Sequence, residues 1–208
     1  MLTSDKEAAA ETKNLRTSTL ARGESRMDGL LGVSRLIDAI SGRVGKLAGW
    51  AIFAAVLVST VNALVRFTFN YSKNSFLEAQ WYLFGFVILL GSAYTFLKNE
   101  HIRIDIISSR LDANTRHWID IFGHVVILIP FCILMTWLGT SFFLRSFASG
   151  EISSSAGGLT LWPAKLLIPT GFALLLLQAF SELIKRVAVL QGIIPDPYAS
   201  HGAHGATE

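Results

Sequence analysis

The chain consists of long apolar runs separated by polar segments, and one of these runs sets the pattern for the rest. It extends from Ala79 to Leu97 without a charged residue and ends at Lys98. At 1.5 Å per residue, a helix of about 19 residues covers the hydrocarbon core of a bilayer. The alternative, a helix buried on all sides in a soluble domain, fits poorly in a chain of 208 residues. The run therefore predicts a transmembrane helix.

Three further runs have the same character and end in residues typical of a membrane interface. Trp50 and Arg66 bracket the first run, and Trp118 and Arg145 bracket the third, in which Pro130 predicts a kink. Tilting can accommodate the extra length of the third run. The sequence predicts an all-α integral membrane protein whose four transmembrane helices cover residues 47–66, 79–97, 119–144 and 164–184.

The terminal segments lack such runs. Residues 1–28 mix charges with Ala, Thr and Ser and have no periodic apolar face, so we expect a disordered cytoplasmic tail. No apolar stretch follows Met1, and no signal peptide is expected. The membrane domain is predicted to cover residues 29–190, and residues 191–208 to form a flexible cytoplasmic tail.

Between the N-terminal tail and the first run, apolar residues recur at steps of three and four from Leu30 to Leu47. This spacing fits an amphipathic helix that lies in the headgroup plane, or one that packs on a partner protein. A shorter amphipathic segment, marked by Ile104, Ile107 and Leu111, follows the second run. We expect both segments at the membrane interface.

Composition supports the membrane assignment and narrows the function. The chain is 51% hydrophobic and only 16% charged, whereas soluble domains contain about 25% charged residues. Its basic residues are scattered between apolar runs, so we expect no nucleic-acid binding. The single cysteine, Cys132, allows no intrachain disulfide and no cysteine-pair chemistry.

The distribution of Lys and Arg predicts the orientation. Fourteen of the 18 lie in the segments before the first run, between the second and third runs, and after the fourth. The other four lie in the remaining two connections. The positive-inside rule then places both termini in the cytoplasm and the Ser- and Gly-rich connection between the third and fourth runs outside.

Polar residues near the ends of the runs are the first candidates for function. Asn62 lies one turn before Arg66. Its side chain is expected either to bond to headgroups and water or to contact a neighbouring membrane helix. Gln178 and Glu182 form a polar face on the fourth run, where a local ion pair from Glu182 to Lys185 or Arg186 is the favoured reading.

A metal site is not expected. His117, Asp120 and His124 share one helix face, but no other predicted membrane helix supplies acidic or histidine partners. His201 and His204 lie in a Gly- and Ala-rich tail. We therefore favour contacts to lipid or to a partner protein for the first group and expect no bound metal or other cofactor.

The sequence also lacks the parts of an enzyme or of an independent transporter. There is no G-x-S-x-G, no phosphate-binding glycine loop and no H-E-x-x-H. No Asp or Glu lies near the middle of a predicted span, where proton relays and coupling-ion sites need such groups. These observations predict a scaffold or partner subunit rather than an enzyme.

Several short motifs, taken in order, carry a family resemblance. Glu78 opens the second run, the small residues 91–93 lie inside it, and Lys98 is followed by a His-Ile-Arg-Ile-Asp sequence at 101–105. Residues 149–165, which include Trp162 and Pro163, lead into the last run. With four spans, this pattern resembles the small, four-helix Q-type membrane subunit of tripartite ATP-independent periplasmic (TRAP) transporters.

The resemblance implies a subunit that binds no substrate itself. In such systems a large permease subunit carries the substrate and sodium sites, and a periplasmic binding protein delivers an organic anion, usually a carboxylate. The small subunit widens the membrane-embedded frame of the permease in the bacterial inner membrane. One departure is Lys98, where arginine is commoner, so a bidentate contact there is in doubt.

The expected partners are thus the large permease subunit, the binding protein and membrane lipid. The candidate residues for partner contacts or interfacial anchoring are Asn62, Arg66, Glu78, Trp81, Lys98, His101, Arg103, Asp105, Trp162, Gln178 and Glu182. Two other readings remain open. One is the membrane anchor of a respiratory enzyme that holds haem between histidines, and the other is an independent small channel or exporter.

Overall fold

The four apolar runs form long helices in the structure, a computed structural model that describes residues 2–70, 74–98, 113–155 and 158–194. Side chains are described from Met27 onward in these ranges, except at 113, 114, 116 and 117. The helices are α1 (Leu2–Phe69), α2 (Asn74–Leu97), α4 (Ala113–Phe122), the π-helical η1 (Gly123–Leu128), α5 (Ile129–Ser149) and α6 (Trp162–Leu190).

Four stretches of helix are long and apolar enough to cross a membrane. They are Met27–Phe69, Asn74–Leu97, Trp118–Ser149 and Trp162–Leu190, and each contains one of the predicted spans. In the described ranges the chain forms no β-strand and only one isolated bridge, between Ile152 and Thr160. The predicted all-α fold with four membrane helices is therefore confirmed.

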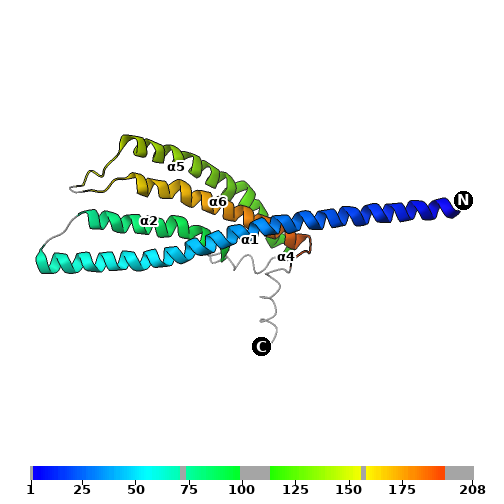
Figure 1. The fold of residues 1–208 in the computed structure, drawn as a ribbon, viewed down its shortest axis with the longest axis horizontal. Helices are drawn as coiled ribbons and strands as arrows, with labels where there is room; N and C mark the ends of the chain where they lie inside the picture. The colour runs from blue at the N-terminus through cyan, green and yellow to red at the C-terminus, as the bar shows by residue number, and fades with distance from the viewer. Residues whose placement is uncertain (1, 71–73, 99–112, 156–157, 195–208) are drawn as a thin grey trace, which may run out of the picture.

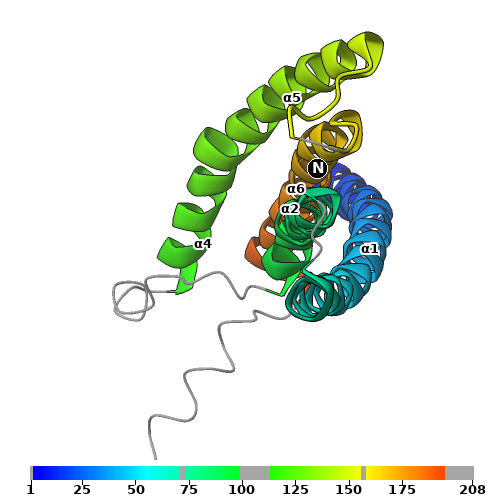
Figure 2. The same ribbon diagram turned by 90° about the vertical axis from the view of Figure 1, so that its left-hand side faces the viewer.

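The helices are arranged around α6. It packs against α1, α2 and α5, and α1 also packs along α2. Figure 1 shows α5, α6, α2 and α1 side by side in this order, and Figure 2, turned by 90°, shows α4 and α5 to one side of α6 with α1 on the other. The described part of the chain is thus an open row rather than a closed four-helix bundle.

The helix predicted from Leu30 to Leu47 is continuous with the first span, and its place in the headgroup plane stays a prediction. The apolar stretch Met27–Phe69 has 43 residues, or about 65 Å of helix, roughly twice the thickness of the hydrocarbon core. Ser34 and Ser41 are buried in it, whereas Leu36 and Leu47 are exposed. Part of the periodic apolar face is exposed, at Leu30, Val33 and Leu47, whereas Ile37 is buried, and the two serines bond to α6.

Residues 1–28 were predicted to form a disordered tail, whereas the structure assigns this segment to helix α1 from Leu2 onward. Ala, Glu, Lys and Arg are common there, and all four favour helix. This part of α1 projects beyond the other helices (Figure 1). An isolated helix is marginally stable in water without tertiary contacts, so disorder of the tail in solution stays a prediction.

A π-helical segment lies just before Pro130 in the third run, where the sequence predicts a kink. The π-helix η1 ends immediately before α5, which carries Pro130 in its first turn. Proline lacks an N–H and its ring clashes with the carbonyl four residues earlier, and a wider helical turn relieves both conflicts. The helical path is therefore continuous from Ala113 to Ser149.

Small residues allow α6 to approach its neighbours. A Cβ added at Gly171 would lie 2.8 Å from the backbone oxygen of Leu89 on α2. A Cβ at Gly139 on α5 would lie 2.9 Å from the Ile168 side chain on α6. Close backbone approach at small residues is a common way for membrane helices to associate, and it holds α6 against α2 and α5.

Candidate functional site

The first group of candidate residues lies where the middle of α1 crosses α6. Ser34, Asp38 and Ser41 on α1 face Gln178, Ser181, Glu182 and Lys185 on α6, and we call these seven residues the α1–α6 polar network. The three α1 residues lie one turn apart, so they share one face of the helix. The two helices therefore meet through polar side chains rather than through an apolar seam.

Gln178 is the centre of this network. Its side chain is fully buried, and its amide oxygen accepts a hydrogen bond from the Ser41 hydroxyl at 2.7 Å. Its amide nitrogen donates to Asp38 at 2.9 Å. The Ser181 hydroxyl also donates to Asp38, at 2.8 Å, and lies 2.7 Å from the Ser34 hydroxyl. Buried polar groups need such partners, and here each helix supplies them to the other.

Lys185 balances the two carboxylates of the network. Its ammonium lies 2.8 Å from Asp38 and 2.7 Å from Glu182. The ion pair from Glu182 to Lys185 was predicted from the sequence and is confirmed. The bond from Gln178 to α1 was not predicted, although the spacing of Ser34, Asp38 and Ser41 was a signal that could have suggested a polar helix contact.

The predicted polar face of the third run also contacts α6. The carboxylate of Asp120 on α4 lies 3.3 Å from the guanidinium of Arg186, which is buried. The imidazole of His124 hydrogen-bonds to the backbone oxygen of Asp120, and its ring lies 5.2 Å from that of Phe96 on α2. The side chain of His117 lies outside the described residues. Asp120 and His124 thus serve helix packing in the structure.

At the opposite end of the molecule, Glu78 holds the connection between α5 and α6, residues 150–161, which we call the α5–α6 loop. Its carboxylate accepts hydrogen bonds from the Ser153 hydroxyl at 2.5 Å and from the backbone N–H of Leu159 at 2.6 Å. One turn along α2, the Tyr82 hydroxyl donates to the backbone oxygen of Thr160 at 2.9 Å. The loop is therefore fastened to α2 by two side chains.

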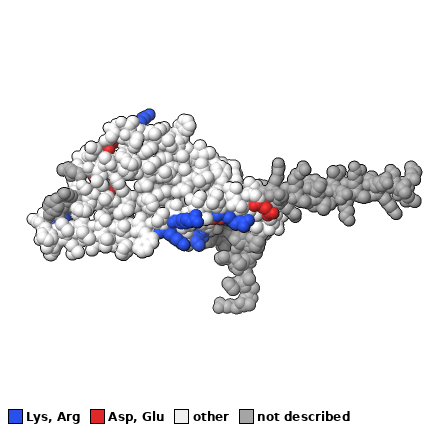
Figure 3. Space-filling model, viewed as in Figure 1, with Lys and Arg blue, Asp and Glu red and all other residues white. Residues whose placement is uncertain are grey.

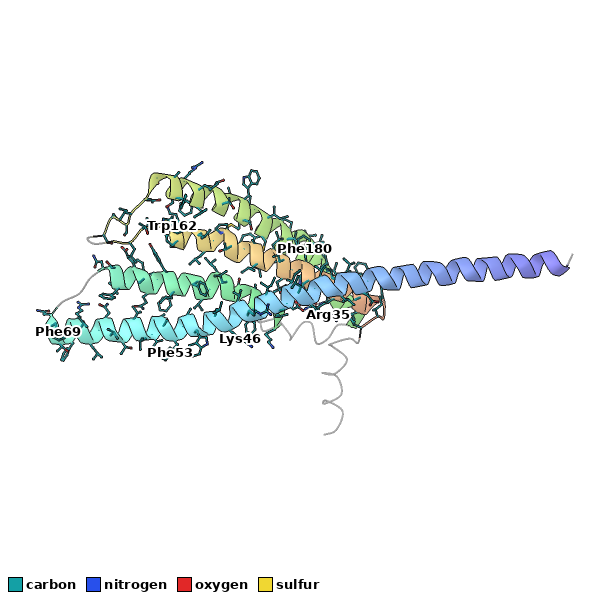
Figure 4. The ribbon with its side chains drawn as sticks, in the orientation of Figure 1. Arg35, Lys46, Phe53, Phe69, Trp162 and Phe180 are labelled. Carbon is teal, nitrogen blue, oxygen red and sulfur yellow. The ribbon has the colours of Figure 1, made fainter. Side chains whose placement is uncertain are left out.

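A second contact fastens the same loop to α6. The Lys165 ammonium donates a hydrogen bond to the Glu151 carboxylate and lies 4.1 Å from the centre of the Phe142 ring. This bond from Lys165 lowers the pKa of Glu151 below its ordinary value. The Trp162 ring packs 5.5 Å from that of Phe147. Figure 4 shows Trp162 at the same end of the molecule as Phe69, far from Arg35.

Asn62 and Arg66 line a cavity of about 540 Å³ at this end, together with residues of α2. Trp81, in contrast, points outward and is 68% exposed, as expected of an aromatic side chain at a membrane interface. The structure thus brings Asn62 and Arg66 together and leaves Trp81 apart from them.

The structure describes the polar segment after the second run only as far as Lys98. Lys98 is exposed, and its ammonium lies 5.9 Å from the centre of the Tyr94 ring. The candidates His101, Arg103 and Asp105 lie outside the described residues, so their predicted role in partner contacts stays a prediction.

Comparison with known proteins adds the identity of the family. A search of curated proteins gives no match to this chain. A family model described as "Tripartite ATP-independent periplasmic transporters, DctQ component" matches residues 55–189. This match gives no support to the alternative of a respiratory membrane anchor. Because the match covers more than half of the sequence, the chain belongs to the DctQ family and is the small permease subunit of a TRAP transporter.

Proposed function

We propose that this chain scaffolds the large permease subunit of its transporter in the bacterial inner membrane. The transporter uses an ion gradient, with sodium as the expected coupling ion in the large subunit. It takes up an organic anion, a carboxylate by the family resemblance, which a periplasmic binding protein delivers. The small subunit itself binds neither the substrate nor the ion.

The observation that carries the proposal is the position of the carboxylates in the described membrane helices and the partners that they bind. Asp38 lies before the first apolar run, Glu78, Asp120 and Glu182 lie at the ends of the other runs, and each of these four is engaged within the chain. Coupling sites in secondary transporters need carboxylates or exposed backbone near the bilayer midplane. These groups instead fasten helices and the α5–α6 loop, which suits a structural subunit.

The surface charge supports an orientation with both termini in the cytoplasm. Figure 3 shows Lys and Arg side chains gathered over α1, at the level of Arg35 and Lys46 in Figure 4. These two residues and Arg43 are exposed. Basic residues that flank membrane helices are retained on the cytoplasmic side. The α5–α6 loop and Glu78 then face the periplasm, where the binding protein operates.

Co-expression with the large permease subunit tests the scaffold role. We expect the two proteins to co-purify in mild detergent, and proteoliposomes that contain both to take up substrate in the presence of the binding protein and an ion gradient. Proteoliposomes with this chain alone should show no flux of ions or substrate. Flux through the isolated chain would favour the channel hypothesis, and uptake by the large subunit alone would remove the scaffold role.

A further inference from the structure

The cavity between α1 and α2 has the chemistry of an anion site that the scaffold role does not use. We call it the α1–α2 pocket. It has a volume of about 540 Å³ and opens to the outside of the helix pair. It is lined by Ser59, Asn62, Ala63, Arg66, Phe67 and Asn70 from α1 and its C-terminal end, and by Leu77 and Gln80 from α2.

The polar groups of the pocket are complementary to an oxyanion. Arg66 supplies a permanent positive charge in a planar fork of N–H donors, and Asn62, Asn70 and Gln80 supply amide donors. Among the described residues that line the pocket there is no Asp or Glu. Among the side chains that the structure describes, none forms an ion pair with Arg66.

The position of the pocket identifies the source of the anion. Arg66 ends the apolar run of the first span, and the pocket therefore lies at headgroup depth. Its rim is apolar, since Phe67 and Leu77 line it and are exposed. Trp81, beside Gln80 in the sequence, is also exposed. A phospholipid offers a phosphate to the polar residues of the pocket and acyl chains to these neighbouring apolar side chains.

We propose that the α1–α2 pocket binds a membrane phospholipid through its phosphate group. Arg66 holds the phosphate oxygens, and the amides of Asn62 and Gln80 complete the hydrogen bonding from the two helices. A carboxylate of a partner protein would satisfy Arg66 equally well, but it would leave the apolar rim without a matching ligand. Inorganic phosphate lacks the acyl chains and should bind far more weakly than the lipid.

Lipid binding to the purified, delipidated full chain tests the proposal. Native mass spectrometry in mild detergent would measure binding of dioleoylphosphatidylglycerol, of dioleoylglycerol, which has the same acyl chains without phosphate, and of inorganic phosphate. We expect clear binding of the phospholipid, at least about tenfold weaker binding of the other two, and a loss of about tenfold in Arg66→Gln.

Two further variants make the result specific. Asn62→Ala should weaken phospholipid binding without removing a charge. Arg145→Gln is the matched control, because Arg145 is an exposed arginine that ends the third run at the same end of the molecule and does not line the pocket. It should bind the phospholipid as the unmodified chain does.

Three outcomes would overturn the proposal. The first is equal phospholipid binding by the unmodified chain and Arg66→Gln. The second is equal binding of dioleoylglycerol and the phospholipid, which would show that acyl chains alone are recognised. The third is loss of co-purification with the large permease subunit in Arg66→Gln while phospholipid binding is unchanged, which would assign the pocket to a protein carboxylate.

Discussion

Helices α5 and α6 are both apolar enough to span a membrane, but α6 is internal in the fold and α5 is peripheral. In the most apolar stretch of α6, 33% of the residues are buried, whereas the value for the helix that contains α5 is 11%. The buried residues of α6 include Gln178, Ser181, Glu182 and Arg186. The exposed residues of α5 include Trp137, Leu138 and Phe142. The more polar helix is therefore the internal one.

Burial of the more polar helix and exposure of the more apolar one are expected in a membrane. Lipid tails are as apolar as leucine, so apolar burial gives membrane helices little reason to associate. Hydrogen bonds and close contacts at small residues drive their packing instead. Helix α6 has both, through the α1–α6 polar network and Gly171. Helix α5 presents apolar side chains, which suit lipid or the surface of a partner subunit.

The largest effect is expected from a change at the centre of the α1–α6 polar network. Gln178→Ala removes the bonds to Ser41 and Asp38 and leaves a cavity in a fully buried position. We expect the free energy of unfolding to fall by about 3 kcal/mol, because buried groups lose their partners as well as their packing. Reversible unfolding in detergent micelles would measure the change.

The control for this change lies on α5. Trp137→Ala removes a larger side chain that is 75% exposed, and it should alter the free energy of unfolding by less than about 0.5 kcal/mol. Equal losses in the two variants would contradict the contrast between an internal α6 and a peripheral α5.

A smaller effect is expected where α6 meets α2. The added Cβ in Gly171→Ala would lie 2.8 Å from the backbone oxygen of Leu89, and a backbone cannot move aside as a flexible side chain can. We expect a loss of about 2 kcal/mol in the free energy of unfolding. The same change at Gly49 on α1, where nothing lies within 4 Å, should leave stability unchanged or raise it by up to about 1 kcal/mol. A stabilising effect of Gly171→Ala, measured in the same micelles, would contradict the close approach.

The sequence was sufficient to predict the four membrane helices, because an uninterrupted apolar run has few alternatives at this length. It also predicted the ion pair of Glu182 with Lys185, since both residues lie on one helix within a turn. The order of the helices in space was not predicted. Periodicity indicates which face of a helix is apolar, but in a membrane an apolar face can point to lipid or to a neighbouring helix.

The segment from Leu30 to Leu47 illustrates this difficulty. Its apolar stripe was interpreted with a rule from the water–membrane interface, where apolar side chains point inward to the acyl chains. In the structure its serines point to α6 because Gln178 and Ser181 offer them partners. Those partners lie more than 130 residues away in the sequence, at separations of 147 and 137 residues. Similarly, Glu78 was a candidate from its position, but its bonds to Ser153 and Leu159 depend on the tertiary fold.

The α5–α6 loop allows a finer test of how α5 is attached. Glu78→Gln keeps the size of the side chain but removes its charge, and one of its two acceptor oxygens becomes an N–H donor that faces another donor. We expect the backbone amide of Leu159 to exchange its hydrogen about tenfold faster. Hydrogen-exchange mass spectrometry of residues 150–161 would measure this rate. Ser154→Ala, at an exposed position in the same loop, should leave the rate unchanged, and protection that survives in Glu78→Gln would contradict the role of the carboxylate.

The smallest effect is expected at the bond between Glu151 and Lys165, because Glu151 is partly exposed to solvent. The Lys165 ammonium lowers the pKa of Glu151 in the folded chain. A lowered folded pKa means that the contribution to stability is present above the ordinary glutamate pKa of about 4.3 and is lost as the pH falls through the folded value. We therefore expect the chain to unfold about 1 °C above its Glu151→Gln variant at pH 7 and at pH 5. This difference should vanish on further acidification toward pH 3. Thermal unfolding of both proteins across this range would measure the difference. A difference that grows as the pH falls would contradict both the lowered pKa of Glu151 and its bond to Lys165.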